Sequence, residues 1–250
     1  MQRLAGKVAI VTGASRGGGR GIALVLGEEG ATVYVTGRSV RDQPTTEPQR
    51  TIDETAEMIT ARGGRAIPVR VDHTVDAQVE ALFERVEEEQ GRIDILVNNA
   101  WGGYEMIDGF WDSKPFWELP LRQWDLMQQA GLRSHLVASR FAIPLMLPQR
   151  QGLIVNTTTG IPPLGKNHPH LFYDVTKVAI NRMSFGMAQD CRPFGIAVVA
   201  LSLGNEHLWM RTEGIGLTRA ETGDELWFQT FSPEYAGRAV AVSYTHLTLP

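Results

Sequence analysis

The 250-residue chain contains 43% hydrophobic and 21% charged residues, enough apolar material for the core of one α/β domain. Its formal net charge is -4 and its cations are scattered, so no basic stripe is available to follow a nucleic-acid backbone. A lone cysteine, Cys191, excludes an internal disulfide, and the chain starts without an apolar signal-like segment; we expect a cytoplasmic protein. The most apolar stretch, residues 136–147, is interrupted by Arg140 and Pro144 and is shorter than the ~20 residues needed to span a bilayer, so no membrane span is expected.

Short apolar runs rich in β-branched residues alternate with longer segments of helical period up to residue 201. Six runs are predicted as strands: residues 7–12, 31–36, 65–71, 93–98, 153–157 and 195–201. Four segments between them are predicted as helices: residues 52–62, 75–89, 122–147 and 173–192. Because the strands are almost continuously apolar, we expect parallel strands covered on both faces. The alternation predicts an α/β fold with a doubly wound parallel sheet and helices on both faces.

Beyond residue 201 this alternation stops. Residues 205–231 mix glycines with aromatic residues, and we interpret them as a flap with an apolar underside that covers the substrate. The polar, proline-containing residues 41–50 are predicted as a surface loop. Residues 243–250 are expected to continue neither the alanine-rich helical run before them nor a strand. We therefore assign one domain to residues 1–242 and leave the tail unassigned.

A glycine-rich turn joins the first predicted strand to a helix. It spans residues 12–21 and includes Thr12-Gly13-Ala14-Ser15-Arg16-Gly17-Gly18-Gly19. Glycines there allow a tight turn and let the backbone approach a pyrophosphate, which the free N–H groups and positive dipole end of the helix would bind. A purely structural glycine turn is the alternative, but the position in the first strand–helix unit favours dinucleotide binding. The candidate binding residues in the turn are Gly13, Ser15, Arg16, Gly17 and Gly19.

The end of the second strand indicates which dinucleotide binds. An acidic side chain at this place binds a ribose 2′-hydroxyl, and a cation binds a 2′-phosphate. Here the strand ends in Val35-Thr36-Gly37-Arg38, without an acid. Arg38, supported by Arg16, would form a charge-assisted clamp on the extra phosphate. Each arginine alone could equally be a solvated surface charge, but together they favour NADP(H) over NAD(H).

Tyr173 and Lys177 are four residues apart on a predicted helix, so they share a face. A free tyrosine, with a pKa of about 10, is a poor acid–base group at neutral pH. A neighbouring ammonium favours the phenolate and lowers that pKa toward the working range. Taken alone, this spacing is also typical of an ordinary amphipathic helix.

The order of the motifs strengthens the functional interpretation. Along the chain come the glycine turn, Asp72 after the third strand, Asn98-Asn99-Ala100 after the fourth, a threonine cluster after the fifth, and then Tyr173 and Lys177. This order resembles the short-chain dehydrogenase/reductase family over residues 4–242. The resemblance implies a single-domain Rossmann-type fold and hydride transfer between a nicotinamide and a carbonyl or alcohol. Tyr173 would exchange the proton with the substrate oxygen, while Lys177 would hold the nicotinamide ribose and lower the tyrosine pKa.

The resemblance also implies further cofactor contacts and an assembly. Asp72 would lie by the adenine, Asn98 and Ala100 along the adenosine side, and Thr212 near the nicotinamide amide or the phosphates. Members of the family form dimers or tetramers on the two long helices that follow strands four and five. We therefore expect a homodimer or homotetramer, a small-molecule carbonyl or alcohol as substrate, and neither nucleic acid nor membrane as a partner.

The chain departs from the family pattern at the serine that polarises the substrate carbonyl. The fifth strand ends in Asn156-Thr157-Thr158-Thr159-Gly160, without a serine. Counting from the strand selects Thr159, whereas counting back from Tyr173 selects Gly160. We assign Thr159 as the third catalytic residue because threonine retains the hydroxyl, with Thr158 as the second choice. A threonine-rich strand end that only packs and caps is the alternative.

A second departure concerns the asparagine that anchors a water in the family's proton relay. Gly131 stands at that position, and a glycine inside a helix indicates close packing or a local irregularity. Gln128, one turn earlier, could supply an amide instead. Gly18 likewise stands where the family usually has an aliphatic residue. These differences leave a second hypothesis open: an NADP(H)-binding sensor or scaffold with little turnover.

Histidines and aromatic residues complete the list of candidates. The four histidines at 135, 168, 170 and 207 do not share a ligand spacing, so no metal site is predicted and we interpret them as surface or loop residues. The aromatic residues between Trp101 and Trp117 either form a wall for a bulky apolar substrate or pack a long insertion. The main hypothesis is an NADPH-dependent carbonyl reductase, or the reverse alcohol dehydrogenase, with Tyr173 as the general acid.

Overall fold

The computed structural model describes residues 2–45, 50–102, 114–159, 170–204, 210, 220, 223–224 and 230–247, and the backbone of Trp209. Within these ranges the predicted alternation of strands and helices is observed.

Six parallel strands form one sheet in the order β3-β2-β1-β4-β5-β6. They are β1 (Val8–Thr12), β2 (Thr32–Gly37), β3 (Arg65–Arg70), β4 (Ile95–Asn98), β5 (Gly152–Thr158) and β6 (Ile196–Ser202). All residues of β1, β4 and β5 are buried, as their unbroken apolar sequences predict for central strands of a covered sheet. The predicted strands are thus confirmed to within two residues, and so is the Rossmann-type fold.

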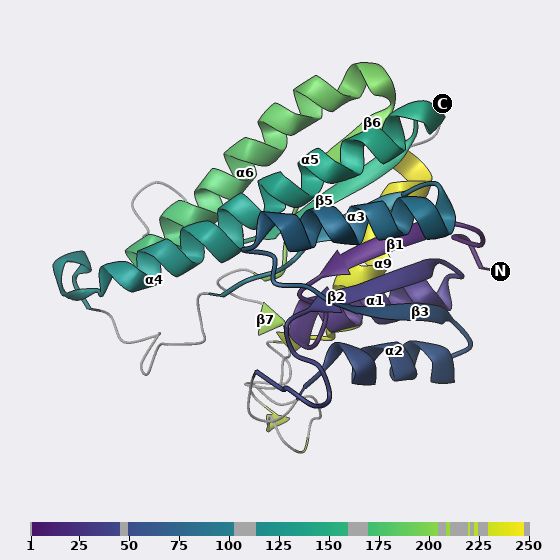
Figure 1. Ribbon diagram of the computed structural model, residues 1–250. Coiled ribbons are helices and arrows are strands. Elements are labelled where there is room, and N and C mark those ends of the chain that lie inside the picture. The colour runs from purple at the N-terminus through teal and green to yellow at the C-terminus, as the bar shows by residue number, and fades with distance from the viewer. Residues whose placement is uncertain are drawn as a thin grey trace.

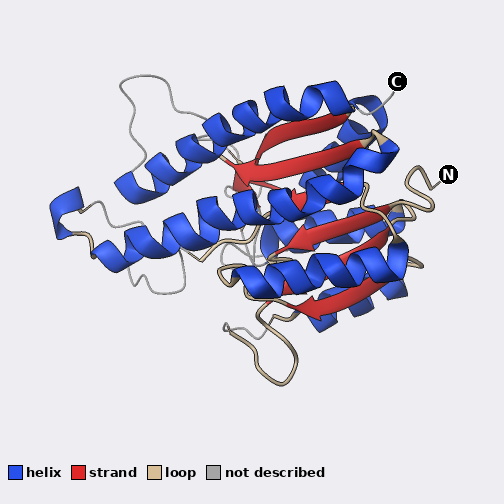
Figure 2. Ribbon diagram, turned by 45° about the horizontal axis from the view of Figure 1, so that its top comes forward, coloured by secondary structure: helices blue, strands red, loops and turns tan. Residues whose placement is uncertain are grey.

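Helices cover both faces of the sheet (Figures 1 and 2). One layer contains α1 (Gly17–Glu28), α2 (Ile52–Ala61) and α9 (Pro233–Leu247), and the other contains α3 (Asp76–Gln90), α5 (Ser134–Met146) and α6 (Leu171–Cys191). Each layer builds its own hydrophobic core against the sheet. Because the strand order reverses between β1 and β4, a crevice is expected beyond the carboxyl ends of these two strands.

The predicted helix at 122–147 is an interrupted rod. It consists of α4 (Leu121–Leu126), the π-helical segment η2 (Met127–Arg133) and α5, and Figure 1 shows it running beside α6 and projecting past the sheet. The π-helical segment contains Gly131, so the local irregularity predicted there is confirmed. Short 3-10 helices, η1 (Phe116–Glu118) and η3 (Leu147–Gln149), flank the rod, and η4 (Arg192–Phe194) follows α6.

Most of the predicted flap at 205–231 lies outside the described residues. Its described parts include two short strands, β7 (Trp209–Met210) and β8 (Thr230–Phe231), which pair in parallel. In the part of the chain that the structure describes, no helix combines the length and the apolarity needed to cross a bilayer.

The prediction that the chain leaves the helix after residue 242 is wrong, because α9 continues to Leu247. Tyr244 is buried there, and its hydroxyl donates a hydrogen bond of 2.9 Å to Oδ1 of Asp94. Asp94 is completely buried and also accepts hydrogen bonds from Arg92 and from the Val8 N–H. Burial acts to raise the pKa of the Asp94 carboxyl, but these hydrogen bonds outweigh it and hold the pKa below its ordinary value. Tertiary contacts, rather than helix propensity, therefore extend the helix.

Candidate active site

The glycine turn packs directly against the segment that follows β4. Gly13 has φ 63°, and a Cβ added to it would lie 2.8 Å from the Ala100 Cα. A Cβ on Gly19 would lie 2.4 Å from both the Gly13 carbonyl oxygen and Nδ2 of Asn99. Gly17 also has a positive φ, of 54°. Side chains at these positions would break the turn, which explains why three glycines occur at this spacing.

Hydrogen bonds join the end of β1 to the segment that directly follows β4. The Thr12 hydroxyl accepts hydrogen bonds of 2.9 Å from the N–H groups of Asn99 and Ala100. In return, Nδ2 of Asn99 donates to the carbonyl oxygens of Thr12 and Gly13, at 3.1 and 2.9 Å. Sequence reasoning assigned no role to Thr12 or Asn99. The signal that could have found them is that polar residues end two strands that are neighbours in the sheet.

The N-terminus of α1 is prepared for an anion. Its N-cap residue, Arg16, makes no side-chain capping hydrogen bond, and no acidic residue lies in the first turn. The positive end of the helix dipole therefore points at the loop, with no acidic side chain in the first turn to neutralise it. With side-chain-free backbone at Gly13 and Gly19, this donor set fits the pyrophosphate of a dinucleotide.

Gly18 is closed over by two side chains from later in the chain. A Cβ at Gly18 would lie 2.9 Å from Cδ1 of Leu203 and 3.1 Å from Cε of Met210. The aliphatic residue that the family pattern expects at Gly18 is thus replaced by apolar groups from the segment after β6.

Arg20 holds the glycine turn against α2. It is 7% exposed, and it donates hydrogen bonds to the Ser15 carbonyl oxygen, to the Thr55 hydroxyl at 3.0 Å and to the Glu54 carboxylate at 2.7 Å. These bonds fix the backbone of Ser15, one of the residues that sequence reasoning assigned to the cofactor.

We expect Arg20→Ala to lower the melting temperature by about 4–8 °C, since the loss of a half-buried charged network costs about 2 kcal/mol in a chain of this size. Cofactor affinity should fall as well, because the Ser15 backbone loses its support. Arg41→Ala is the matched control: Arg41 pairs with Glu57 while both side chains are more than 60% exposed, so its melting temperature should not change. Calorimetry on both variants checks this, and equal effects would contradict it.

Arg38 directly follows β2, and its positive charge acts on the ionisation of Asp72 and His73. Burial acts to raise the pKa of Asp72, but hydrogen bonds from Thr74 and the charge of Arg38 hold it below its ordinary value. Burial lowers the pKa of His73 to about 4, so this histidine is neutral at pH 7, with Nε2 2.8 Å from the Thr36 hydroxyl. A cation after β2 thus acts on an ionised carboxylate after β3.

Asn98 does not join the other predicted cofactor residues. Its side chain is completely buried, and Nδ2 donates to the Ser139 hydroxyl and to Oδ1 of Asn156, both at 2.9 Å. It braces β4 against α5 and β5, while the next residue, Asn99, contacts the glycine turn. The Ala100 backbone lies against the glycine turn.

The structure brings Tyr173 and Lys177 together at the start of α6. The ring of His170 caps this helix by accepting a hydrogen bond from the Tyr173 N–H. Nζ of Lys177 lies 5.6 Å from the centroid of the Tyr173 ring and 4.2 Å from that of Trp101. Lys177 is 7% exposed, and burial lowers its pKa to about 7. The ammonium is therefore poised to lose a proton near neutral pH.

The two candidate threonines differ in what their hydroxyls contact. Thr158 ends β5, and its hydroxyl donates to the Lys177 carbonyl oxygen at 3.0 Å, so it ties the strand to α6. Thr159 follows directly, and its carbonyl oxygen accepts a hydrogen bond from Asn181. No hydrogen bond joins the Thr159 hydroxyl to any described residue. This difference favours Thr159 over Thr158 as a donor to substrate.

The segment around Gly131 has a different arrangement from the family pattern. A Cβ at Gly131 would lie 2.4 Å from Cζ3 of Trp101, so the indole fills the adjacent space. The side-chain amide of Gln128 is already bonded inside the protein, because its Nε2 donates a hydrogen bond of 2.9 Å to the Thr176 hydroxyl.

The interpretation of the histidines as surface or loop residues is wrong for His135, which lies on α5 and is 1% exposed. His170 precedes α6, outside any helix or strand, although it is only 3% exposed. Burial, together with the charge of Lys177, lowers the pKa of His135 to about 3, so this side chain is neutral beside the lysine. Residues 168 and 207 lie outside the described part of the chain, as does Thr212. Among the described residues, no group of three or more His, Cys, Asp or Glu side chains is arranged to hold a metal ion.

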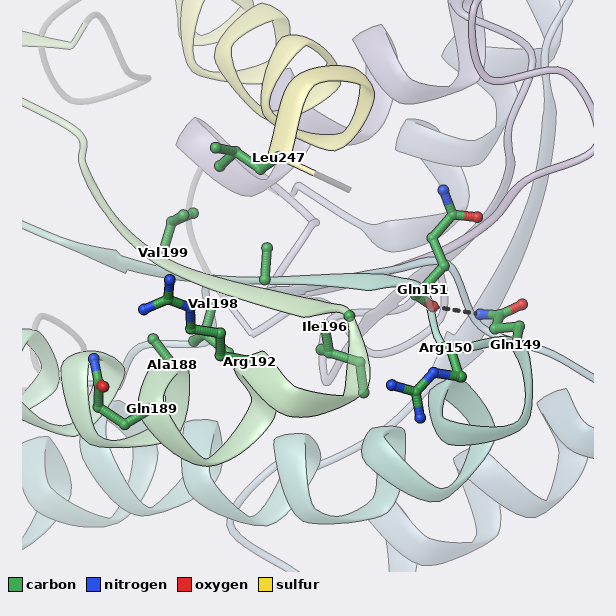
Figure 3. Close-up of a pocket in the computed structure, with 12 residues that line it drawn as sticks. Gln149, Arg150, Gln151, Ala188, Gln189, Arg192, Ile196, Val198, Val199 and Leu247 are labelled. Atoms are coloured by element: carbon green, nitrogen blue, oxygen red, sulfur yellow. Dashed lines mark hydrogen bonds between the residues drawn. The ribbon is translucent and has the colours of Figure 1, made fainter. Parts of the chain in front are cut away.

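A hollow elsewhere on the surface is lined by none of the candidate site residues. It measures about 610 Å³ and lies beside β6, the edge strand, between the ends of α6 and α9 (Figure 3). Its lining includes Gln149, Arg150, Ile196 and Leu247. The hollow therefore lies near the amino-terminal end of β6, whereas open α/β sheets bind ligands beyond the carboxyl ends of their strands.

Comparison with known proteins agrees with this geometry. The sequence model of the short chain dehydrogenase family matches residues 7–213. The chain belongs to the short-chain dehydrogenase/reductase family. This family uses nicotinamide cofactors, so the chain is an oxidoreductase by descent.

Two curated relatives carry the name dehydrogenase/reductase SDR family member 1. The protein from Mus musculus is 38% identical over 233 residues, which cover 92% of this chain and 70% of the relative. The protein from Homo sapiens is 40% identical over 198 residues, which cover 78% of this chain and 59% of the relative. The chain thus spans only part of the length of these relatives.

Solved structures share the fold over almost the whole chain. A metagenomic short-chain oxidoreductase in complex with NADP is 25% identical, with a TM-score of 0.75 over 98% of this chain and 92% of that one. A short-chain dehydrogenase/reductase mutant from Serratia marcescens is 26% identical, with a TM-score of 0.75 over 97% of this chain and 91% of that one.

Proposed function

We propose that this short-chain dehydrogenase/reductase is an NADP(H)-dependent enzyme that transfers a hydride between the nicotinamide and a carbonyl or alcohol substrate. The observation that carries the proposal is the buried Lys177 ammonium, 5.6 Å from the centroid of the Tyr173 ring. A cation beside a phenol is the arrangement that general acid–base chemistry by tyrosine needs near neutral pH. The NADP complex of the metagenomic relative supports the choice of cofactor.

In the reducing direction, the Tyr173 hydroxyl donates its proton to the carbonyl oxygen of the substrate. The Lys177 ammonium stabilises the phenolate that remains, and it does so strongly because the site is buried. The Thr159 hydroxyl donates a hydrogen bond to the same substrate oxygen and orients it. When bound, the nicotinamide supplies the hydride, or accepts it in the reverse reaction.

The remaining residues hold the cofactor. Backbone N–H groups of the glycine turn and α1 bind the pyrophosphate, and Arg16 and Arg38 bind the 2′-phosphate. Lys177 also holds the nicotinamide ribose. The full proposed set is Gly13, Ser15, Arg16, Gly17, Gly19, Arg38, Asp72, Ala100, Tyr173, Lys177 and Thr212. Asn98 contributes through the packing of β4, because its side chain is bonded inside the protein.

A second candidate function is an NADP(H)-binding sensor with little turnover. Two departures from the family pattern favour it. Gly131 offers no amide where the family has an asparagine, and the end of the fifth strand has no serine.

Steady-state and stopped-flow loss of NADPH absorbance over a panel of aldehydes, ketones and quinones separates the two candidates. Turnover on at least one substrate, abolished in Tyr173→Phe, supports the enzyme. Tight NADPH binding without turnover on any member of the panel supports the sensor.

We also propose that the chain forms a homodimer or homotetramer through the α5 and α6 faces. Large apolar side chains are exposed there in the single chain: Leu136, Leu171, Val175, Val178 and Phe185. These two helices are the ones on which the family assembles, so a second copy of the chain is the occupant we expect.

Phe185→Asp should weaken this assembly by at least about 100-fold, because Phe185 is 55% exposed and a carboxylate in an apolar interface costs several kcal/mol. Light scattering coupled to size-exclusion chromatography checks the mass. Val75→Asp, at the N-cap of α3, changes an exposed apolar residue outside α5 and α6 and should leave the mass unchanged. A wild-type chain that is monomeric at high concentration would refute the interface.

A further inference from the structure

Trp101 occupies the centre of the candidate site, directly after the Asn99-Ala100 segment. Its ring lies 4.2 Å from Nζ of Lys177, centroid to nitrogen, and makes an edge contact with the Tyr173 ring, with centroids 5.5 Å apart and planes at 78°. The indole therefore contacts both members of the acid–base pair.

The π-helical segment gives the indole its space. A Cβ at Gly131 would lie 2.4 Å from Cζ3 and 2.7 Å from Cε3 of Trp101. Both distances are too short for real contacts, so a side chain at 131 and the indole in this position exclude each other. In this chain the Trp101 ring fills the space beside position 131, where the family carries its asparagine side chain.

The surroundings of Lys177 leave the indole as its main electrostatic partner. Among the described residues, no carboxylate forms an ion pair with Lys177. From α5, His135 interacts electrostatically with Lys177, and it stays neutral because burial lowers its pKa to about 3. From its own helix, the Tyr173 ring lies farther away than Trp101, at 5.6 Å against 4.2 Å. The negative face of an indole stabilises a cation at this distance, which opposes the effect of burial.

We propose that Trp101 is a positioning residue that keeps the Lys177 ammonium charged and beside Tyr173, in the space that a side chain at 131 would otherwise take. The inference rests on the proposed acid–base role of Tyr173 and Lys177 and names the group that sustains it. Without the indole face, Lys177 loses its proton at lower pH. The Tyr173 phenolate then loses part of its stabilisation, and Tyr173 ionises at higher pH.

The first test measures the ionisation of Tyr173 without cofactor or substrate. Tyrosinate absorbance is followed against pH, and the curve of the matching Tyr173→Phe protein is subtracted. Trp101→Leu should raise the midpoint of Tyr173 by about one pH unit, whereas Trp101→Phe, which keeps a ring face, should raise it clearly less. The pH at which alcohol oxidation is half-maximal should move in the same direction.

The controls separate electrostatics from packing. Trp124 packs in the same apolar cluster, against Phe172, and has no contact with Lys177. Trp124→Leu should therefore lower the melting temperature but leave the Tyr173 midpoint unchanged. Equal midpoints for Trp101→Leu and Trp101→Phe, or no shift in Trp101→Leu, would overturn the proposal. Because this titration needs no turnover, it can succeed even if no substrate is found and the proposed enzyme activity fails.

A second test uses the mutual exclusion of the two side chains. Gly131→Asn should lower the melting temperature because of the clash, and adding Trp101→Ala should restore part of it. Changes in melting temperature that simply add would show that the indole does not fill this space and would overturn the proposal.

Discussion

Replacing Tyr173 by phenylalanine is expected to lower the rate of NADPH-dependent reduction by about 10²- to 10⁴-fold, the contribution typical of a positioned general acid. The change removes the hydroxyl and keeps the ring that contacts Trp101. Binding of NADPH should change little, because the glycine turn and the Lys177 ammonium are untouched. The loss should therefore appear mainly in kcat, and a fluorescence titration should give a dissociation constant within about threefold of the wild-type value, since Tyr173 is one of several cofactor contacts.

Tyr235→Phe is the matched control for this experiment. Tyr235 lies on α9 with 64% of its surface exposed, and its ring contacts Phe231. Its variant should retain full activity. If Tyr173→Phe turned over like the wild type, the acid would have to be another group and the proposed mechanism would be wrong.

The fold could be predicted from the sequence because each strand is a short apolar run and each helix repeats its apolar residues at helical spacing. These are local signals, and the sheet order follows from the rules of parallel connections. The end of α9 was not predictable in this way. Its last turn depends on the contact of Tyr244 with Asp94, 150 residues earlier in the chain.

The candidate site was only partly predictable, for a similar reason. Tyr173 and Lys177 lie close together because one helix carries both. Which of Asn98 and Asn99 contacts the glycine turn could not be predicted. Their side chains point in different directions, Asn98 toward Ser139 and Asn99 toward the Gly13 carbonyl, so a shift of one residue in register would swap their contacts. Periodicity does not fix that register at a strand end.

Two departures from the family pattern have a common explanation. Gly18 and Gly131 both stand where the family carries a side chain, and both spaces are filled from elsewhere in the chain, by Leu203 with Met210 and by Trp101. A sequence motif describes a space by the residue that fills it in most members. When another segment fills the same space, the motif is lost while the packing is retained.

Arg38→Asp should reverse the cofactor preference. An arginine–phosphate pair contributes about 1.5–3 kcal/mol, so its loss should raise the KM for NADPH by about 10- to 100-fold. The new carboxylate repels the 2′-phosphate and can accept a hydrogen bond from the 2′-hydroxyl of NADH. Arg38 also helps to keep Asp72 ionised, so part of the loss should come from the adenine side of the site.

Arg41→Asp gives the comparison, because Arg41 is a neighbouring arginine of the same loop that is 62% exposed and pairs with Glu57. Its variant should leave the ratio of kcat/KM for NADPH and NADH unchanged, while Arg16→Ser should lower the ratio by less than Arg38→Asp does. A preference for NADPH that survived Arg38→Asp would mean that Arg38 does not bind the 2′-phosphate. The 2′-phosphate would then have to be bound from the glycine turn alone, where Arg16 is the cation not paired with Glu54 as Arg20 is.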